Sequence, residues 1–398
     1  MSAQSPLSMM RPRPPRPHRS VPPRRRLWRV VLLGAIVVAL PIGWTALWSY
    51  AASIASETLA GWIGREAALG RVYACGSQSI GGFPFGIVIH CDKASAAFNS
   101  NRPPFDVSAS DFTFSAQVFR PTLLNGEVSA PVTLADPGQG PAFVANWSAA
   151  QLALLGLPPE PERVTVNLTK PRLDRTAGAN AGMIFQADRL DVDGRIIAGS
   201  ARRNPVIEAN AKVTAALAPS FHPLLAEPLQ GEIDAVMRGF KDFQPKPWSV
   251  LFRDMQASGG GIEIKTLRFA RSDAALLGSG TFTINAAGRL QGELRVTVAG
   301  VENIVPLLGV DQLIGQGIDR LTGGSGSPAQ GLGALDRLLP GLGGVVRESA
   351  SAGLIETIKR MGEPTKLDGK PAVALPLRVA DGIVYVGIIP VAVVPALF

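Results

Sequence analysis

The stretch that decides the fold is RVYACGSQSIGGFPFGIVIHCDKASAAF, residues 71–98. Two strand patterns flank a glycine- and proline-rich turn, an arrangement typical of a β-hairpin. Cys75 and Cys91 lie at equal distances from residue 83, so we expect them opposite each other, with Cα atoms about 4.5–5.5 Å apart. We predict a structural disulfide that adds on the order of 3 kcal/mol of stability. The hairpin motif between its arms is Gly81, Gly82, Phe83, Pro84 and Phe85.

Two other uses of the cysteines fit the sequence less well. A metal centre needs more Cys or His than His90 and His222, the two histidines that follow residue 29. A redox motif has two residues between its cysteines, whereas fifteen separate these two. We therefore predict no metal and no cofactor, and we assign His90 to the surface because it alternates with Ile89 and Cys91.

Beyond the hairpin, apolar and polar residues alternate along the chain. Leu294, Val296 and Val298 are one such run, and Val164, Val166 and Leu168 are another. This period predicts strands with one buried face. The fold class is α+β and mainly antiparallel β, with a large one-sided curved sheet and a few covering helices.

One local pattern occurs three times in the chain. Leucine, an amide residue, glycine, glutamate and an aliphatic residue follow one another at 124–128, 229–233 and 290–294. A repeated ligand contact and convergent hairpin chemistry both explain it. We expect the glycine to permit a bulge or bend and the glutamate to face water.

Residues 301–362 differ from the rest of the domain. Two stripes with helical spacing flank the linker-like sequence TGGSGSPAQG at 322–331. These helices could cover the apolar face of the sheet or lie on a membrane surface. We favour covering because neither polar face is rich in lysine or arginine.

The N-terminal part predicts a membrane anchor. Residues 1–29 hold eight arginines and no acidic residue, and we expect a disordered cytoplasmic tail. It also has the composition of an SH3-type ligand or an anionic-lipid contact. Residues 30–50 are long and apolar enough to span a bilayer, and the arginine asymmetry places the N-terminus inside.

The competing interpretation of this segment is a cleaved signal peptide. Ser53-Ile54-Ala55 resembles a cleavage site, but the apolar run exceeds the length of a signal h-region. We favour an uncleaved signal anchor in the bacterial inner membrane, followed by a juxtamembrane helix at 51–70. Residues 71–398 would then form a periplasmic β-rich domain.

Charge and motifs exclude several function classes. The net charge of +8 comes from the tail, because the rest of the chain has 31 basic and 31 acidic residues. We therefore predict no nucleic-acid partner. The sequence contains no nucleotide-binding or hydrolase motif, and we assign no catalytic residue.

Several blocks together resemble an uncharacterised bacterial family of membrane-anchored envelope proteins, known as a domain of unknown function. The resemblance covers most of residues 60–398, and it implies no activity. A weaker likeness, through the GFPF turn and the hairpin at 278–300, is to LmeA-type and AsmA-like lipid-handling envelope proteins. The blocks that carry the first resemblance are GRVYAC at 70–75, IGGFPF at 80–85, HC at 90–91, VADG at 379–382, VG at 386–387 and Pro395.

Three functions remain open at the level of sequence. The first is a membrane-anchored periplasmic protein that binds or transfers lipid in envelope maintenance, with lipid and the inner membrane as its partners. The second is a structural or interaction protein of the envelope without a ligand. The third is an undetected hydrolase. The sequence identifies neither ligand-binding residues nor protein partners.

Overall fold

The computed structural model describes residues 24–157, 160–178, 180–221, 223–243, 246–304, 355–356, 358–387 and 389–398. Most of the predicted tail, residues 1–23, and most of the predicted helical segment, residues 305–354, lie outside this set. The chain divides into two units, Met1–Ser53 and Ile54–Phe398. We describe each unit separately.

Helix α1 (Arg24–Ala68) contains the predicted anchor and continues into the second unit. Among the described helices, α1 is long and apolar enough to cross a membrane. Pro41 lies within it. The helix ends in a turn in which the Gly70 N–H donates to the Ala67 carbonyl over 3.0 Å, and Gly70 adopts a positive φ of 79°.

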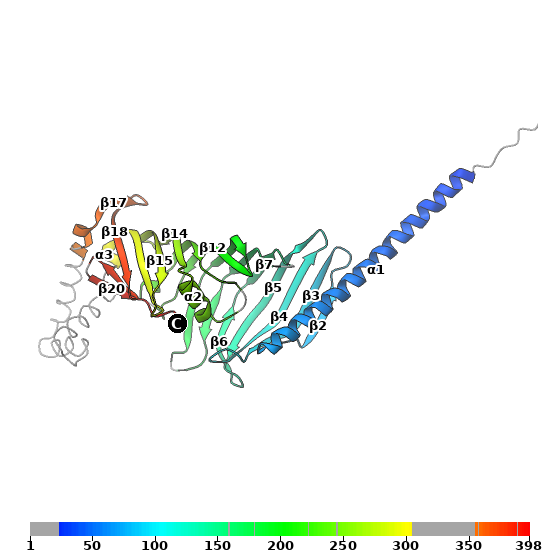
Figure 1. The fold of residues 1–398 in the computed structure, drawn as a ribbon, viewed down its shortest axis with the longest axis horizontal. Helices are drawn as coiled ribbons and strands as arrows, with labels where there is room; N and C mark the ends of the chain where they lie inside the picture. Colours follow the sequence, from blue (N-terminus) through cyan, green and yellow to red (C-terminus); the bar gives the residue numbers. More distant parts are fainter. Residues whose placement is uncertain are drawn as a thin grey trace, which may run out of the picture. The chain divides into compact units, whose positions relative to one another are not determined.

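The second unit is dominated by one antiparallel sheet, as predicted (Figure 1). Its first ten strands are β1 (Arg71–Ala74), β2 (Ser77–Gly81), β3 (Gly86–Phe98), β4 (Phe105–Gln117), β5 (Arg120–Ala135), β6 (Pro141–Asn146), β7 (Ala149–Leu155), β8 (Arg163–Thr169), β9 (Arg172–Arg175) and β10 (Gly182–Gln186). The remaining ten are β11 (Arg189–Ser200), β12 (Arg203–Ala216), β13 (Leu229–Arg238), β14 (Gly261–Ala270), β15 (Ala275–Ile284), β16 (Leu290–Ala299), β17 (Glu363–Leu367), β18 (Lys370–Ala380), β19 (Ile383–Val386) and β20 (Ile389–Val393).

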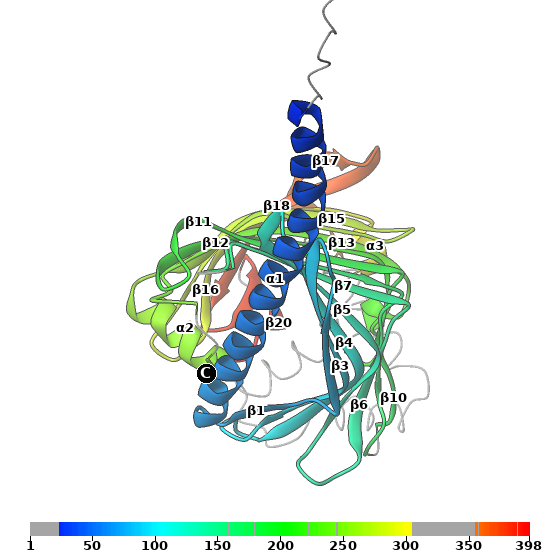
Figure 2. The ribbon, with the colours of Figure 1, turned by 90° about the vertical axis from the view of Figure 1, so that its right-hand side faces the viewer.

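The strands form a meander in which most pairs are consecutive in the chain. From β11 to β16 each strand pairs with the next, and β16 then pairs with β18. The long strand β5 pairs with β7 along one half and with β6 along the other, so the sheet branches there. The sheet is open, and it curves so that one face is concave (Figure 2).

The fully buried apolar side chains gather toward the C-terminal half of the sheet. Within the described residues, the buried hydrophobic set begins at Ile184 and ends at Val386. One cluster forms where helix α2 (Trp248–Ala257) packs Leu251 and Met255 against the sheet. Thus α2 is a covering helix, and the sequence analysis did not predict it.

The ends of the predicted helical segment contribute a second buried cluster. Helix α3 (Val301–Ile304) begins with Val301, which packs with Ile358, Val296 and Leu375. These contacts agree with the expectation that the segment covers the apolar face at this end. The part of the expectation that concerns residues 305–354 lies outside the described residues.

The threefold sequence pattern has a structural explanation. Each glycine lies directly opposite a phenylalanine of the neighbouring strand, and the register of these three pairings is unbroken at the glycine. Next to Gly231 the pairing of β13 with β12 does shift, between Val213 and Ala216, so an irregularity of the expected kind is found at one of the three sites. A Cβ on the glycine would lie 3.0–3.2 Å from the ring in every case. The glycines make room for aromatic rings. The pairs are Gly126 with Phe114, Gly231 with Phe269, and Gly292 with Phe282.

Candidate functional site

The strand register brings apolar residues into continuous rows on one face of the sheet. One row takes one residue from each strand that it crosses, and each residue lies directly opposite the next one in the row. None of these residues is polar. It consists of Ile80, Ile89, Phe114, Gly126, Leu152, Val166, Val192, Ala211, Ile233, Leu267, Gly278, Val296 and Leu375. With strands about 4.8 Å apart, its twelve steps extend for about 58 Å.

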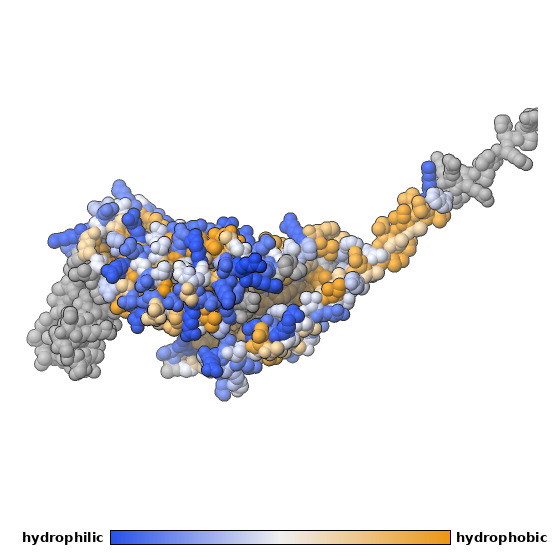
Figure 3. All heavy atoms as spheres, viewed as in Figure 1, coloured by the Kyte–Doolittle hydropathy of each residue, from blue (hydrophilic) through white to orange (hydrophobic). Residues whose placement is uncertain are grey.

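A parallel row on the same face is equally apolar. It consists of Ile87, Ala116, Leu124, Leu154, Val164, Gly194, Ala209, Ala235, Ile264, Gly280, Leu294, Leu377 and Val386. On most strands the members of the two rows are two residues apart and so share a face. On β14 they are Ile264 and Leu267, which are separated by a β-bulge. The two rows together form one apolar band. The space-filling view shows a hollow with hydrophobic residues on its floor (Figure 3). We call the surface formed by these two rows the apolar band.

The row next to the first apolar row, on the side away from the second, faces the other side of the sheet and is polar over most of its length. It consists of His90, Thr113, Glu127, Gln151, Asn167, Asp191, Lys212, Glu232, Arg268, Leu277, Thr297 and Ala374. Water therefore solvates one face, whereas the other face needs an apolar partner.

In the first half of the sheet, this partner is absent among the described residues. Apart from Gly126, which is buried, the band residues on β3 to β8 are half-buried, and Val192 on β11 is 36% exposed. By contrast, Val296 at the other end is 1% exposed. Among the described residues, the band is largely buried at its C-terminal end and more accessible near its N-terminal end.

A cavity of about 420 Å³ lies in the C-terminal part of the band. Leu276, Val298 and Leu377 are among its lining residues, and Arg271 is its one charged side chain. The Arg271 guanidinium donates to both carboxylate oxygens of Asp273 over 2.8 and 2.9 Å. The pairing neutralises the charge, so the cavity is suited to an apolar group.

The two cysteines form a disulfide, as predicted, but they do not occupy opposite positions in the strands. Gly81 pairs with Val88, so the hairpin is centred between Pro84 and Phe85, and Cys91 lies opposite Gln78. Cys75 lies in the break between β1 and β2, where the Gly76 N–H donates to the Asp92 carbonyl over 2.9 Å. The break brings the two Cα atoms to 5.6 Å, within disulfide range.

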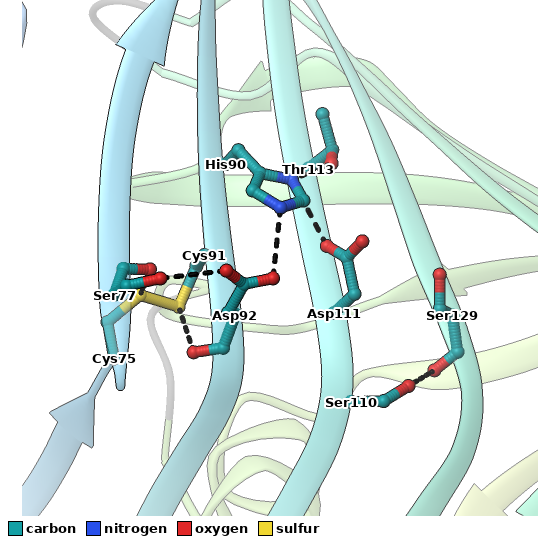
Figure 4. Close-up of polar contacts among 9 residues, drawn as sticks. All are labelled: Cys75, Ser77, His90, Cys91, Asp92, Ser110, Asp111, Thr113 and Ser129. Atoms are coloured by element: carbon teal, nitrogen blue, oxygen red, sulfur yellow. Dashed lines mark hydrogen bonds and ion pairs between the residues drawn. A yellow bond between two sulfur atoms is a disulfide. The ribbon is translucent and has the colours of Figure 1, made fainter.

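A polar cluster lies on the opposite face, beside the disulfide (Figure 4). His90 Nε2 is 3.1 Å from Asp92 Oδ1, and His90 Nδ1 is 3.2 Å from Asp111 Oδ1 and 3.0 Å from Thr113 Oγ1. The Ser77 hydroxyl donates to Asp92 over 2.7 Å and, together with His90, lowers the pKa of Asp92.

This polar cluster is also a group of possible metal ligands. His90, Asp92 and Asp111 each offer one ligand atom, and these atoms lie within 4.8 Å of one another. A cation there would have to replace the contacts that join the histidine to the two carboxylates. His90 has 37% of its side chain exposed, so it lies at the surface, where the sequence analysis placed it.

The remaining motif residues lie at a hairpin tip. Gly81 ends β2, and residues 82–85 form the turn into β3, where the Gly86 N–H donates to the Gly82 carbonyl over 2.9 Å. The motif is therefore a surface element and lies outside the two rows of the band. The sequence predicted a sheet with one apolar face, from the alternation within each strand, but it identified no ligand-binding residue and could not show that the apolar residues form continuous rows.

Comparison with known proteins finds one family. The model described as "Uncharacterized protein conserved in bacteria (DUF2125)" matches residues 48–395. No curated protein matches the chain, and no solved structure matches it.

Proposed function

The chain belongs to this family of uncharacterised proteins conserved in bacteria, and we propose that it binds the acyl chains of lipids along its apolar band. The observation that carries the proposal is the pair of uninterrupted apolar rows that cross the sheet. Acyl chains are flexible and apolar, so their binding depends on the apolar surface area that is removed from water rather than on directed hydrogen bonds. A band of about 58 Å is longer than the roughly 30 Å hydrocarbon thickness of a bilayer.

The uneven burial of the band supports this proposal. Its C-terminal end is packed against α2 and the residues next to α3, which is the ordinary arrangement of a protein core. Its N-terminal half has half-buried residues on successive strands. An exposed apolar surface of this extent is typical of a binding surface.

We further propose that the body lies in the periplasm and that the anchor lies in the inner membrane. The apolar helix supports anchoring, and the disulfide supports an oxidising compartment. The eight arginines of residues 1–29 support a cytoplasmic N-terminus. Lipid would then be available at the membrane next to the body, which fits a role in maintaining the envelope.

A structural protein without a ligand is the second candidate. One observation favours it: Val301 and Ile358, which flank residues 305–354, pack onto Val296 and Leu375. If the intervening chain continued along the band, it would fill the band as an ordinary core. The two candidates therefore differ in what touches the half-buried part of the band.

Site-specific photocrosslinking distinguishes these candidates. Benzoylphenylalanine is placed at Val166, on the band, or at its neighbour Asn167, on the polar face, in full-length protein in cells. We expect ultraviolet light to attach lipid at position 166 and none at position 167, as measured by the mass of the tryptic peptide. Adducts at 166 to peptides from residues 305–354 would instead support the structural candidate. The absence of lipid at both positions would contradict lipid binding.

A further inference from the structure

Two neighbouring hairpins expose apolar side chains at their tips. The tip between β2 and β3 carries Phe85, which is 61% exposed, and the tip between β4 and β5 carries Phe119, which is 76% exposed. The two rings stack with centroids 6.3 Å apart, and the Val118 N–H donates to the Phe85 carbonyl over 3.0 Å. We call this surface, formed by Phe83, Phe85, Val118 and Phe119, the aromatic tip.

The other end of the same strands has a different composition. The β3–β4 connection includes the sequence NSNRPP at 99–104, and the β5–β6 connection includes DPGQG at 136–140. Neither contains a large apolar residue. Exposure of phenylalanine rings to water is unfavourable. Among the turns that join β2 to β6, the exposed phenylalanines lie at one end of the strands, which indicates an apolar partner at that end.

The course of the chain places the aromatic tip at the end where the membrane segment joins the body. Trp62 of α1 packs against Tyr73 of β1 with ring centroids 4.9 Å apart, and Glu66 pairs with Arg71, so helix and strand run antiparallel. From Trp62 back to Ile54 the helix covers about 12 Å. From Tyr73 to Phe83 the extended chain can cover about 33 Å, which is enough to return the tip to the level of Ile54.

The charge of these two hairpins suits a lipid surface. Neither residues 67–91 nor residues 112–126 contain an acidic residue. Arg120 follows Phe119 and is exposed, so it can reach the phosphates of lipid headgroups. Aromatic rings with an adjacent cation are typical of chains that lie at a bilayer interface.

We propose that the aromatic tip rests in the interface of the bilayer that holds the anchor. This contact would fix the body at two points, the anchor and the tip, and would hold the N-terminal end of the apolar band at the lipid surface. It does not require lipid in the band.

Fluorescence quenching in vesicles tests this contact. Full-length Phe119→Cys is labelled with the fluorophore NBD and reconstituted into vesicles of phosphatidylcholine and phosphatidylglycerol. Both native cysteines are in the disulfide, so the introduced thiol takes the label. The matched control is Phe221→Cys, because Phe221 is 71% exposed and lies in the connection from β12 to β13, at the other end of the strands.

We expect NBD at position 119 to emit at shorter wavelength than at position 221. We also expect lipids with a nitroxide on the acyl chain to quench position 119 strongly and position 221 hardly at all. Equal emission and equal quenching at both positions would overturn the proposal. A blue shift at 119 without nitroxide quenching would overturn it too, because it would mean that the tip is buried against protein.

Discussion

Cys75 lies in a break between two strands. The disulfide and the backbone hydrogen bonds between the strands therefore stabilise different parts of the hairpin. Cys91 belongs to the regular pairing with β2, whereas Cys75 lies between β1 and β2. The sulfur bridge therefore secures the part of the hairpin that backbone hydrogen bonds hold least well. Equal spacing in the sequence predicted the bond but not the register, because the turn is centred one to two residues later than residue 83.

Loss of this bond should destabilise the domain without changing its fold. We expect Cys75→Ser to lower the free energy of unfolding by about 3 kcal/mol, because closing a loop of this size restricts the unfolded chain. Urea denaturation followed by circular dichroism measures the change. Reduced wild-type protein is the control and should match the variant. Equal stability of the oxidised wild type and Cys75→Ser would contradict the prediction.

The strands are the elements whose sequences say most about the fold. Alternation within β16 and β8 correctly predicted their two faces, because the period of a strand depends on residues that are neighbours in the chain. The partner of each strand depends on residues far away, so the Phe–Gly pairs could not be predicted. Helix α2 was missed since two of its ten residues are buried, which leaves a short apolar stripe. The apolar band became apparent from the register, which places the apolar residues of successive strands opposite one another.

The Phe–Gly pairs predict which glycines of the band tolerate a side chain. A Cβ on Gly126 would lie 3.0 Å from the Phe114 ring and 3.3 Å from Leu152. Gly194 lies in the other row and has nothing within 4 Å of the same position. We expect Gly126→Val to lower the free energy of unfolding by about 1–3 kcal/mol through overpacking.

Gly194→Val is the matched control for this substitution. It should stay close to the stability of the wild type, since its side chain meets open space and valine favours strands. Thermal unfolding of both variants followed by circular dichroism makes the comparison. Similar losses at the two positions would mean that strand propensity, rather than contact with the aromatic ring, decides the tolerance.

For the whole molecule, the decisive property is the side of the membrane on which the body lies. We expect alkaline phosphatase fused after Phe398 to be active and green fluorescent protein fused there to be dark, because the arginines of the tail retain the N-terminus in the cytoplasm. Activity and fluorescence of intact cells measure the outcome. The same reporters fused before Met1 are the control and should give the reverse pattern. A fluorescent C-terminal fusion would refute the proposed orientation.

The open meander leaves the length of the molecule adjustable. A closed barrel ties its number of strands to its shear and diameter, so an inserted hairpin disturbs the closure. An open sheet has no such condition, and most strands here pair with their neighbours in the chain. A duplicated hairpin would extend the apolar rows by about 10 Å and leave the other registers unchanged. Duplication of hairpins during evolution can therefore change the length of the apolar rows without changing the residues of the existing surface.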